Sequence, residues 1–348
     1  MRAAVFRAPG IVDVVERDEP EIVDATDAIV RVRRAGICGS DLHFFHGKAP
    51  MDAGTTMGHE AVGTVDRIGS GVRSFAAGDR VVTSFHIACG ACWFCRVGRS
   101  GLCEEHRILG GGPFGGDLDG TQAELVRVPV ADVNLRAVPG TVDDERALFV
   151  GDVLTTGVYT VSIADPAPDE TVAVIGAGPV GYCVAAALRS AGVDRVYAID
   201  VEPARLELVE TTGAEPVDPR AVNPEMALAR ATDGRGADVV VDAVGVPEVF
   251  ATSLELVRRG GRVVVVGMYT SEVVELQLGV AWIRGVRLLF AGETPIHAWW
   301  GQTMDAVADG RLDPAPLVSH RLPLTDAPGG YAAFDAHEAT KVVLDPWA

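Results

Sequence analysis

A short apolar strand that runs directly into a glycine-rich turn constrains this chain more than any other stretch. Residues 171 to 181 read T-V-A-V-I-G-A-G-P-V-G, and a helical pattern follows up to Ala191. A second strand, residues 195 to 199, ends at Asp200, which lies 24 residues after Gly176. A strand, a G-x-G-x-x-G turn, a helix and a following acid form the sequence context of a dinucleotide-binding unit. Further strands are expected near Glu215 and over residues 237–242, 261–267 and 286–291, giving a doubly wound parallel sheet.

The residues of this turn have separate expected roles. Gly176 permits the tight turn, Gly178 lets the backbone approach a pyrophosphate at the helix N-terminus, and Gly181 allows the helix to pack closely on the strand. Asp200 is expected to accept hydrogen bonds from the adenosine ribose hydroxyls. Its charge, with that of Glu202 nearby, repels a 2′-phosphate, so NAD is preferred over NADP. The expected cofactor-binding residues are Gly176, Gly178, Pro179, Val180, Gly181, Asp200 and Arg205. Arg205 has a second interpretation, as the partner of a carboxylate at a helix start.

Four of the six cysteines form a compact cluster, C-G-A-C-W-F-C-R-V-G-R-S-G-L-C. Its members are Cys89, Cys92, Cys95 and Cys103. Tetrahedral zinc takes four thiolates, and C-x-x-C turns bring two sulfurs to one ion without strain. Two disulfides are the alternative, which a reducing compartment disfavours. The spacing therefore predicts a structural zinc, because a closed set of four thiolates leaves no position for a substrate.

Composition and charge narrow the class of protein. The chain has 348 residues, 48% of them hydrophobic, and a net charge of −18. This length favours two domains, and the acidic balance disfavours nucleic acid as a partner. No apolar run reaches about 18 residues, so no membrane span is expected. The first residues, MRAAVFRAPG, do not resemble a signal peptide, and the expected location is the cytoplasm.

The first 85 or so residues contain short β-like runs punctuated by glycine and proline, as in a compact β-rich domain. Within them lie G-I-C-G-S-D-L-H, residues 36–43, and M-G-H-E-A-V-G-T-V, residues 57–65. Cys38, His43, His59 and Glu60 in these stretches are candidate metal ligands or acid–base groups, since Cys and His suit zinc. Taken singly, each is also compatible with an ordinary structural role, because a lone cysteine is usually a small buried hydrophobe.

Asp152 lies within an apolar stretch, residues 141–164, that has a helical pattern. Buried carboxylates are rare unless they are paired or bound to a metal, so Asp152 is a candidate third ligand. The alternative is a helix N-cap. The glycine-rich residues 110–124 lack the Lys-Ser/Thr ending of a phosphate-binding loop. They are either a flexible connection or a wall of an active-site cleft. Cys183, at an apolar position of the expected helix, is assigned to the core.

These motifs, in this order, resemble the zinc-dependent medium-chain alcohol dehydrogenases across nearly the whole chain. The resemblance rests on G-I-C-G-S-D-L-H, then G-H-E-x-x-G followed by Gly69 and Val72, then the four cysteines, then G-A-G-P-V-G with Asp200. It implies an α/β fold in which a GroES-like β-rich catalytic domain, residues 1–152 with 292–348, encloses in sequence a Rossmann domain, residues 153–291. The tail S-H-R-L-P-L-T-D-A-P is most similar to the formaldehyde-dehydrogenase-like bacterial group.

The resemblance also implies roles for individual residues. Cys38, His59 and Asp152 correspond to the ligands of a catalytic zinc, and Glu60 corresponds to a nearby carboxylate that can approach the metal. Ser40 corresponds to the hydroxyl that contacts the zinc-bound oxygen, and His43 to a relay histidine near the nicotinamide ribose. Phe85 falls where the family lines its substrate pocket.

The implied reaction interconverts alcohols with aldehydes or ketones. A hydride passes to NAD⁺ from the carbon of an alcohol whose oxygen is held by zinc, and the proton leaves through Ser40, the ribose and His43. The expected cofactors are therefore NAD and two zinc ions per chain, one catalytic and one structural. A polyol or threonine-type dehydrogenase on the same scaffold remains open. So do a non-catalytic zinc-binding member and a thiol–disulfide oxidoreductase that uses the C-x-x-C pairs. The expected partners are a small-molecule substrate and further copies of the chain, as a homotetramer or a dimer.

Overall fold

The structure is a computed structural model that describes residues 1–116, 118–271 and 273–348. It divides into two compact units, which we call the first unit (Met1–Thr155 with Glu293–Ala348) and the second unit (Thr156–Gly292). The expected boundaries after residues 152 and 291 fall within three residues of these. Residue 117, in the glycine-rich stretch 110–124, lies outside the described residues.

The first unit is built around a sheet whose strands run in the order β16-β17-β3-β4-β5-β9, with β8 also paired to β3. Alternating apolar residues of these strands face a buried core that includes Val30, Val65, Val81 and Val126. The bounds are β3 Ala28–Ile37, β4 Ala61–Ile68, β5 Arg80–Thr83, β8 Leu125–Val128, β9 Leu135–Ala137, β16 His320–Pro323 and β17 Val342–Asp345. The β-rich first domain expected from the sequence is thus present, and it contains the C-terminal segment as well as the N-terminal one.

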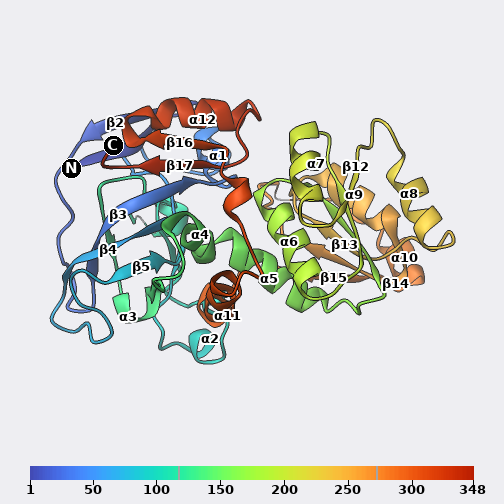
Figure 1. The fold of residues 1–348 in the computed structure, drawn as a ribbon, viewed down its shortest axis with the longest axis horizontal. Helices are drawn as coiled ribbons and strands as arrows, with labels where there is room; N and C mark the ends of the chain where they lie inside the picture. Colours follow the sequence, from blue (N-terminus) through green and yellow to red (C-terminus); the bar gives the residue numbers. More distant parts are fainter. Residues whose placement is uncertain (117, 272) are drawn as a thin grey trace. The chain divides into compact units, whose positions relative to one another are not determined.

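Two hairpins and several short helices complete the first unit. β1 (Arg2–Ala8) pairs with β2 (Ile11–Glu16), and β6 (His86–Ile87) pairs with β7 (Arg107–Ile108). The helices are α1 Asp41–Phe45, α2 Trp93–Arg96, α3 Ala131–Asn134, α4 Asp144–Leu148, α11 Ile296–Ala308 and α12 Ala327–Asp335, with 3-10 turns η1 Ser100–Leu102, η2 Gly112–Gly115, η3 Phe149–Gly151, η4 Ala315–Leu317 and η5 Leu324–Asp326. Helix α12 runs along β16 and β17 (Figure 1), so the C-terminal segment completes the core begun by the N-terminal one.

The apolar stretch 141–164 is helical over most of its length, as its pattern indicated, but it is not one continuous helix. It is divided into α4, η3 and α5 (Val153–Ala164), and the break falls at Asp152, whose φ is −151° and ψ −101°. A Cβ on Gly151 would lie 2.1 Å from the Thr83 carbonyl oxygen, so only glycine lets the chain approach β5 this closely. The interruption is what brings the Asp152 carboxylate inward instead of leaving it on a continuous helix. No described helix is by itself long and apolar enough to cross a membrane, and one bent pair, Asp144–Gly151 with Val153–Ala164, meets the length and composition only when taken together.

The second unit contains the expected doubly wound parallel sheet, in the order β12-β11-β10-β13-β14-β15. Every residue of β10 is buried, as expected of a central parallel strand. The bounds are β10 Thr171–Ile175, β11 Arg195–Ile199, β12 Glu215–Val217, β13 Ala237–Asp242, β14 Val257–Val265 and β15 Arg287–Phe290. The helices are α6 Pro179–Ser190, α7 Pro203–Glu210, α8 Pro224–Ala231, α9 Pro247–Leu256 and α10 Leu278–Arg284. Helices α6 and α7 cover one face of this sheet and α8 to α10 the other (Figure 1).

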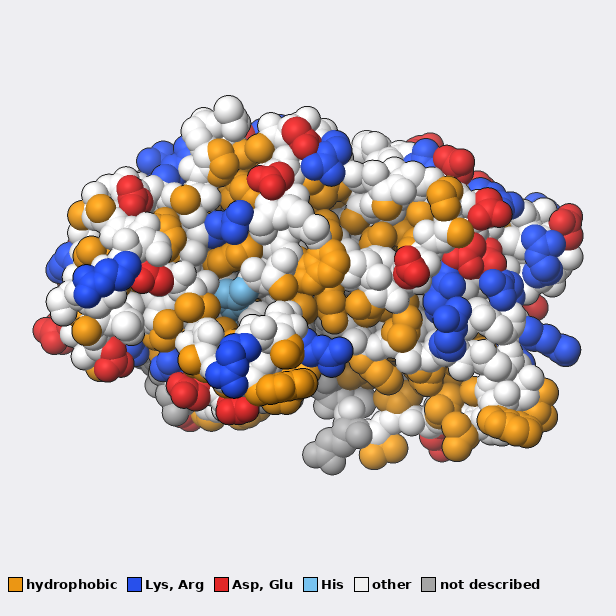
Figure 2. Space-filling view, turned by 90° about the horizontal axis from the view of Figure 1, so that it is seen from below, with side chains coloured by type: hydrophobic (Ala, Val, Ile, Leu, Met, Phe, Trp, Pro, Cys, Tyr) orange, Lys and Arg blue, Asp and Glu red, His pale blue; other side chains and the backbone are white. Residues whose placement is uncertain are grey.

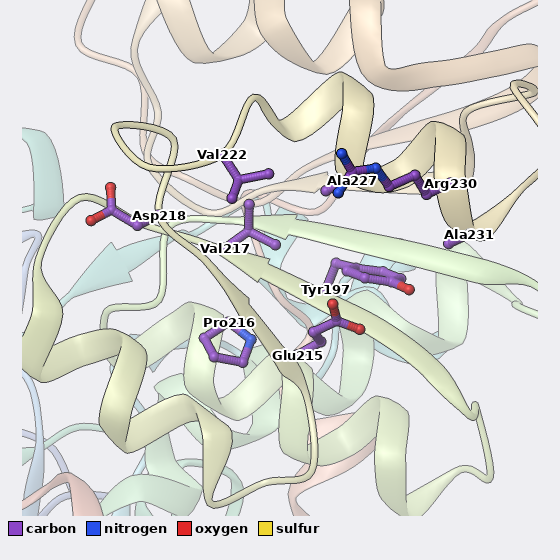
Figure 3. Close-up of a pocket in the computed structure, with 9 residues that line it drawn as sticks. All are labelled: Tyr197, Glu215, Pro216, Val217, Asp218, Val222, Ala227, Arg230 and Ala231. Carbon is purple, nitrogen blue, oxygen red and sulfur yellow. The ribbon is translucent and has the colours of Figure 1, made fainter.

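Two surface features of the second unit stand outside the expected sites. Hydrophobic side chains gather on part of its surface (Figure 2), and the most exposed ones on α10 and β15 are Leu278, Trp282, Ile283 and Phe290. A pocket of about 410 Å³ lies along β11, β12 and α8 (Figure 3). Its lining includes Tyr197, Glu215 and Arg230 but none of the residues expected to bind metal or cofactor.

Candidate metal centres and cofactor turn

Cys38, His59 and Asp152, from three separate segments, meet in the first unit. Cys38 follows β3, His59 precedes β4, and Asp152 precedes α5. Cys38 Sγ lies 3.6 Å and His59 Nε2 lies 3.2 Å from Asp152 Oδ2. With Glu60 they form a buried group whose donor atoms all lie within 4.8 Å of one another. Asp152 therefore faces the other two donors, as expected of a ligand.

Asp41 holds the site together, and the sequence reasoning missed it. Its fully buried carboxylate places Oδ1 3.1 Å from His59 Nδ1, while Oδ2 accepts hydrogen bonds from Cys38 N–H (2.9 Å) and Gln122 Nε2 (3.4 Å). A carboxylate on one ring nitrogen fixes the tautomer and leaves the other nitrogen to bind a metal. Oδ1 makes no hydrogen bond of ordinary geometry, so Asp41 acts on His59 as a close charge beside Nδ1, and Nε2 is the ring nitrogen near Asp152. An acid three residues after Cys38 was the available signal in the sequence.

Glu60 is held by Lys341, a second residue that the sequence reasoning missed. Both side chains are fully buried, and Lys341 Nζ donates to Glu60 Oε2. A Cβ on Gly36 would lie 1.8 Å from that oxygen, so the glycine before Ile37 makes room for the pair. The other oxygen, Oε1, has no hydrogen-bond partner. An unpartnered, buried carboxylate oxygen beside three metal-type donors fits a cation at this place.

The ionisation of the site also fits a cation. Burial, followed by the charges of Asp152 and Glu60, raises the pKa of the Cys38 thiol. Burial raises the pKa of Glu60 to about 7 despite the nearby Lys341. Burial alone would lower the pKa of His59, but Asp41 and Asp152 raise it well above 6.5. Without a metal the site thus favours protons on these donors. A divalent cation replaces the protons and converts the thiol to a thiolate.

Ser40, His43 and Phe85 lie around this group at different distances. Ser40 Oγ is 3.3 Å from His59 Nε2, which places a hydroxyl beside the ligand nitrogens. The Phe85 ring centre is 6.1 Å from that of His59. His43 lies on α1 and does not belong to the group of donors. Burial, with Lys48 and His46 nearby, lowers its pKa.

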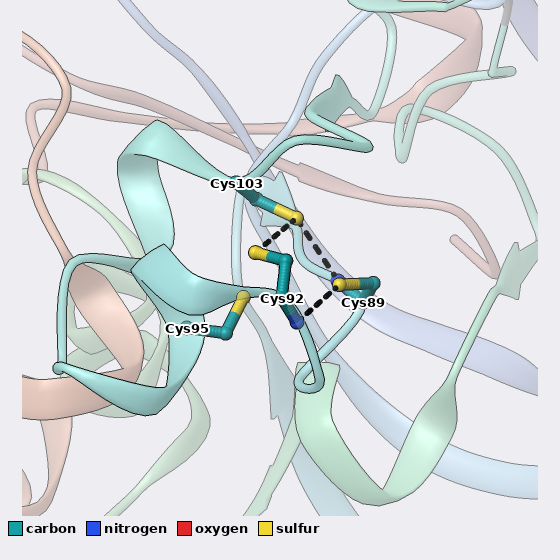
Figure 4. Close-up of side chains that lie close together, drawn as sticks. All are labelled: Cys89, Cys92, Cys95 and Cys103. Atoms are coloured by element: carbon teal, nitrogen blue, oxygen red, sulfur yellow. Dashed lines mark hydrogen bonds between the residues drawn. The ribbon is translucent and has the colours of Figure 1, made fainter.

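The four clustered cysteines turn their sulfur atoms toward a common centre in the loop between β6 and β7 (Figure 4). Cys92 Sγ and Cys103 Sγ are 3.9 Å apart, and all six cysteines are free thiols. Sulfurs bound at 2.3 Å to a tetrahedral zinc lie about 3.8 Å apart, whereas a disulfide needs about 2.05 Å. Backbone N–H groups of Cys89 and Cys92 donate to sulfurs of Cys103 and Cys89, at 3.3 Å each. The cluster fits a four-thiolate zinc and is not arranged as disulfides.

The glycine turn in the second unit has the expected geometry. Gly176 has φ +92°, and a Cβ on Gly181 would lie 1.8 Å from the Gly176 carbonyl oxygen. Gly178 is the N-cap of α6, with Pro179 and Val180 in the first turn, and a Cβ there would meet no atom within 4 Å. The free space beside Gly178 and the uncapped N–H groups of α6 fit a pyrophosphate.

Asp200 ends β11 beside this turn. Its Oδ2 accepts a hydrogen bond from Ala177 N–H (2.7 Å), and its Oδ1 accepts one from Glu202 N–H (2.9 Å). Arg205 lies 3.8 Å from Asp200 Oδ2, so it is a neighbour of the carboxylate, as its second interpretation requires. Asp200 therefore fixes the loop as well as presenting a negative charge next to it. Cys183 is buried in α6, in agreement with its assignment to the core.

Comparisons with known proteins agree with the fold. The model of the alcohol dehydrogenase GroES-like domain matches residues 24–139, and that of the zinc-binding dehydrogenases matches residues 179–307. The chain belongs to the zinc-dependent medium-chain alcohol dehydrogenase family. It is accordingly an alcohol oxidoreductase that uses zinc and a nicotinamide cofactor.

Individual relatives cover almost the whole chain. Zinc-type alcohol dehydrogenase B of Aspergillus flavus is 35% identical over 99% of this chain and 81% of its own length. A glutathione-independent formaldehyde dehydrogenase of Pseudomonas aeruginosa is 32% identical over 99% of this chain and 97% of its own. The structure of the alcohol dehydrogenase TADH from Thermus sp. ATN1 is 41% identical, with a TM-score of 0.95 and 99% of each chain covered.

Two further solved structures contain nicotinamide cofactors. A zinc-binding dehydrogenase of Sinorhizobium meliloti bound to NADP is 31% identical, with a TM-score of 0.87 and 99% of each chain covered. An alcohol dehydrogenase of Escherichia coli complexed with NADH is 25% identical, with a TM-score of 0.86 and 99% of each chain covered. Both forms of the cofactor thus occur among proteins similar to this chain.

Proposed function

We propose that this protein is an NAD-dependent alcohol dehydrogenase with one catalytic and one structural zinc per chain. The observation that carries the proposal is the meeting of Cys38, His59 and Asp152 around one point, with the Ser40 hydroxyl 3.3 Å from His59 Nε2. Three protein ligands with one position left open are typical of catalytic zinc. Zinc in such a site supplies a Lewis acid that lowers the pKa of a bound alcohol and holds the developing negative charge.

Residues of the chain orient the metal ligands and transfer the proton. The Asp41 charge beside His59 Nδ1 favours the ring tautomer that leaves Nε2 to bind the metal. Ser40 Oγ is the group that takes the alcohol proton, and His43 is the proposed exit of that proton to solvent, as the family resemblance implies. Lys341 holds Glu60 Oε2, which leaves Glu60 Oε1 free beside the three ligands.

The test of the catalytic site is Cys38→Ala, with Cys183→Ala as the matched control. Cys183 is the one other cysteine outside the cluster of four, and it is buried in the second unit. We expect Cys38→Ala to abolish turnover and to lower bound zinc by one ion per chain, while Cys183→Ala loses none. Full activity in Cys38→Ala would refute the assignment.

The preference for NAD is proposed from Asp200, and two substitutions separate its charge from its structural role. Asp200→Asn keeps an oxygen for Ala177 N–H but removes the negative charge, whereas Asp200→Gly removes both. If Asp200 binds the ribose hydroxyls and repels a 2′-phosphate, both variants weaken NAD and improve the relative use of NADP. The ratio of kcat/KM for the two cofactors is the measurement, and an unchanged ratio in both would contradict the proposal.

The substrate is proposed only as a class, a small alcohol or the corresponding aldehyde or ketone. The similarity to a formaldehyde dehydrogenase supports including formaldehyde in an activity screen. Simple alcohols, polyols and threonine, each with NAD⁺ and NADP⁺, complete the panel. Activity confined to threonine or polyols would replace the simple-alcohol assignment.

We also propose that the chain forms a homo-oligomer and works in the cytoplasm. Trp282 and Phe290 are 80% and 71% exposed, and they lie on α10 and on β15, the last strand of the six-stranded order. Such an apolar patch at a strand edge supports contact with a second copy. Free thiols in two C-x-x-C pairs support a reducing compartment. Light scattering of Trp282→Glu tests the first point, since an unchanged mass would exclude this surface as the contact.

A further inference from the structure

A third group of metal-type donors lies in the first unit and shares no residue with the two sites above. It consists of His86, His106 and Glu293. Glu293 Oε2 is 2.9 Å from His86 Nε2 and 3.3 Å from His106 Nε2. His106 Nε2 is also 2.8 Å from His86 Nδ1. One carboxylate oxygen and two imidazoles therefore meet at one place.

The fold fixes this group from two sides. His86 is on β6, and His106 immediately precedes β7, its hairpin partner. Glu293 opens the segment that returns to the first unit, and a Cβ on Gly101 would lie 2.2 Å from its carbonyl oxygen. The close approach at Gly101 holds the Glu293 backbone against the cysteine loop. His86 is fully buried, whereas the side chains of His106 and Glu293 are 23% and 40% exposed. The group is thus closed behind His86 and reachable from solvent at the other two donors.

The hydrogen bonds of this group leave one of its buried ring nitrogens unsatisfied. His86 Nε2 is buried and makes no hydrogen bond of ordinary geometry, although Glu293 Oε2 lies 2.9 Å away. Only one proton can lie between His86 Nδ1 and His106 Nε2, so His106 Nε2 cannot serve both His86 and Glu293 well. Burial lowers the pKa of His86, which disfavours adding a second proton to its ring. A metal cation between this ring nitrogen and the carboxylate would satisfy both groups.

The spacing of the donors fits a small transition-metal ion. Donors bound at 2.0–2.1 Å to a tetrahedral ion lie about 3.3 Å apart, and Glu293 Oε2 lies 2.9 Å from His86 Nε2 and 3.3 Å from His106 Nε2. The Cys38 site shows similar separations, 3.2 and 3.6 Å, between its donors. Two histidines and one carboxylate are also a recurrent ligand set for zinc and related metals with open positions.

We propose that His86, His106 and Glu293 bind a divalent transition-metal ion, as a third cation site of this chain with open positions toward solvent. Phe85 separates it from the Cys38 site, with its ring centre 3.8 Å from that of His86 and 6.1 Å from that of His59. The ion ties the β6–β7 hairpin to the return segment at Glu293. This proposal rests on the geometry of these donors and does not depend on the proposed function.

The first experiment counts zinc in the whole protein. His106→Asn and Glu293→Gln remove one donor each at partly exposed positions, which avoids the folding risk of changing the buried His86. The matched control is His337→Asn, because His337 is exposed with φ +60° and Asn tolerates that backbone conformation. Each protein is dialysed against buffered zinc, and zinc and sulfur are measured by elemental analysis. We expect one zinc fewer per chain in both variants than in the wild type and the control. Equal zinc in all four proteins over the whole range of free zinc would overturn the proposal.

The second experiment needs no variant and distinguishes this site from the thiolate sites. Cobalt(II) is added to wild-type protein that carries only two zinc ions per chain, so that the two thiolate sites are filled, and the visible and near-ultraviolet spectra are recorded. One further equivalent should bind and give ligand-field bands without a thiolate charge-transfer band, because this site contains no sulfur. The same titration of Glu293→Gln should lack that equivalent. Cobalt that binds only with a thiolate band, or does not bind at all, would show that these residues hold no metal.

Discussion

The two expected zinc sites of the first unit bind the same metal but differ in the kinds of ligand, in their spacing along the chain and in burial. The cysteine cluster draws four identical ligands from residues 89–103, and three of them are only partly buried. The Cys38 site draws different ligands from residues 38, 59 and 152, all of them buried and surrounded by further charged groups. A local loop suffices to close a structural site, whereas an open site needs its ligands oriented by the surrounding fold. The two sites should therefore respond differently to changes nearby.

The largest effect on stability is expected from Cys103→Ala. Structural zinc contributes on the order of 10 kcal/mol in small zinc domains, and Cys103 is the buried member of the cluster. We expect loss of one zinc per chain, a lowered Tm and proteolytic cleavage within residues 89–103. Zinc at the Cys38 site should remain, as measured by elemental analysis. Loss of both ions would show that the two sites are not independent.

The next effect is expected at the Lys341–Glu60 pair, which has no counterpart in the cysteine cluster. Lys341→Met leaves a buried carboxylate without its cation, which costs about 3–5 kcal/mol of unfolding free energy. Adding Glu60→Gln should recover part of that loss, because the unpaired charge is then gone. Denaturant unfolding of the two single variants and the double variant measures the coupling. If the loss of unfolding free energy in the double variant equalled the sum of the losses in the two single variants, the two residues would not act as a pair.

A smaller effect should separate the two metal sites by affinity. Asp41→Asn weakens the orientation of His59, and such partners typically change metal affinity about 10- to 100-fold. Competition with a chelator should show one zinc lost more readily than in the wild type, while the cysteine-bound zinc is unchanged. Unaltered release of both ions would mean that His59 is oriented by other contacts.

The smallest effect is a change of stability with pH at His297, which attaches the cysteine loop through Ser100. His297 Nε2 donates to Asn134 Oδ1, and Nδ1 accepts from Ser100 Oγ, each at 2.8 Å. This direction follows because Asn134 Nδ2 donates to the carbonyls of Ala88 and Pro129, which fixes its amide oxygen toward His297. Burial lowers the pKa of His297 to about 3, so the native state keeps a neutral ring.

The sign of the pH effect follows from linkage. Between pH 6.5, the ordinary value for histidine, and about pH 3, the unfolded chain binds a proton at residue 297 that the native state does not. The stabilisation from this residue is therefore present above pH 6.5 and decreases below it, by at most about 1.4 kcal/mol per pH unit. The difference in unfolding free energy between wild type and His297→Gln should shrink as the pH falls below 6.5. A constant difference would contradict the neutral assignment.

The parts of the molecule that were predictable from sequence are those whose residues act over short distances along the chain. The turn at Gly176, Gly178 and Gly181 and the cysteine cluster depend on local spacing, and the structure has both in the expected form. The helical pattern of residues 141–164 was confirmed, but it did not show the break at Asp152, because the pattern of apolar residues does not reveal the close approach of Gly151 to Thr83. Periodicity reports which face is buried and not where a tertiary contact interrupts a helix.

The sequence by itself determined the family, the two kinds of domain and the identity of the zinc-type donors, because these depend on residue types at fixed spacings. Only the tertiary structure decided that Asp41 orients His59, that Lys341 neutralises Glu60, and that His86 and His106 meet Glu293. The last two contacts join residues that are about 190 to 280 positions apart in the chain. The type of a residue determines which donor atoms are present, whereas the packing of distant segments determines which other atoms those donors contact.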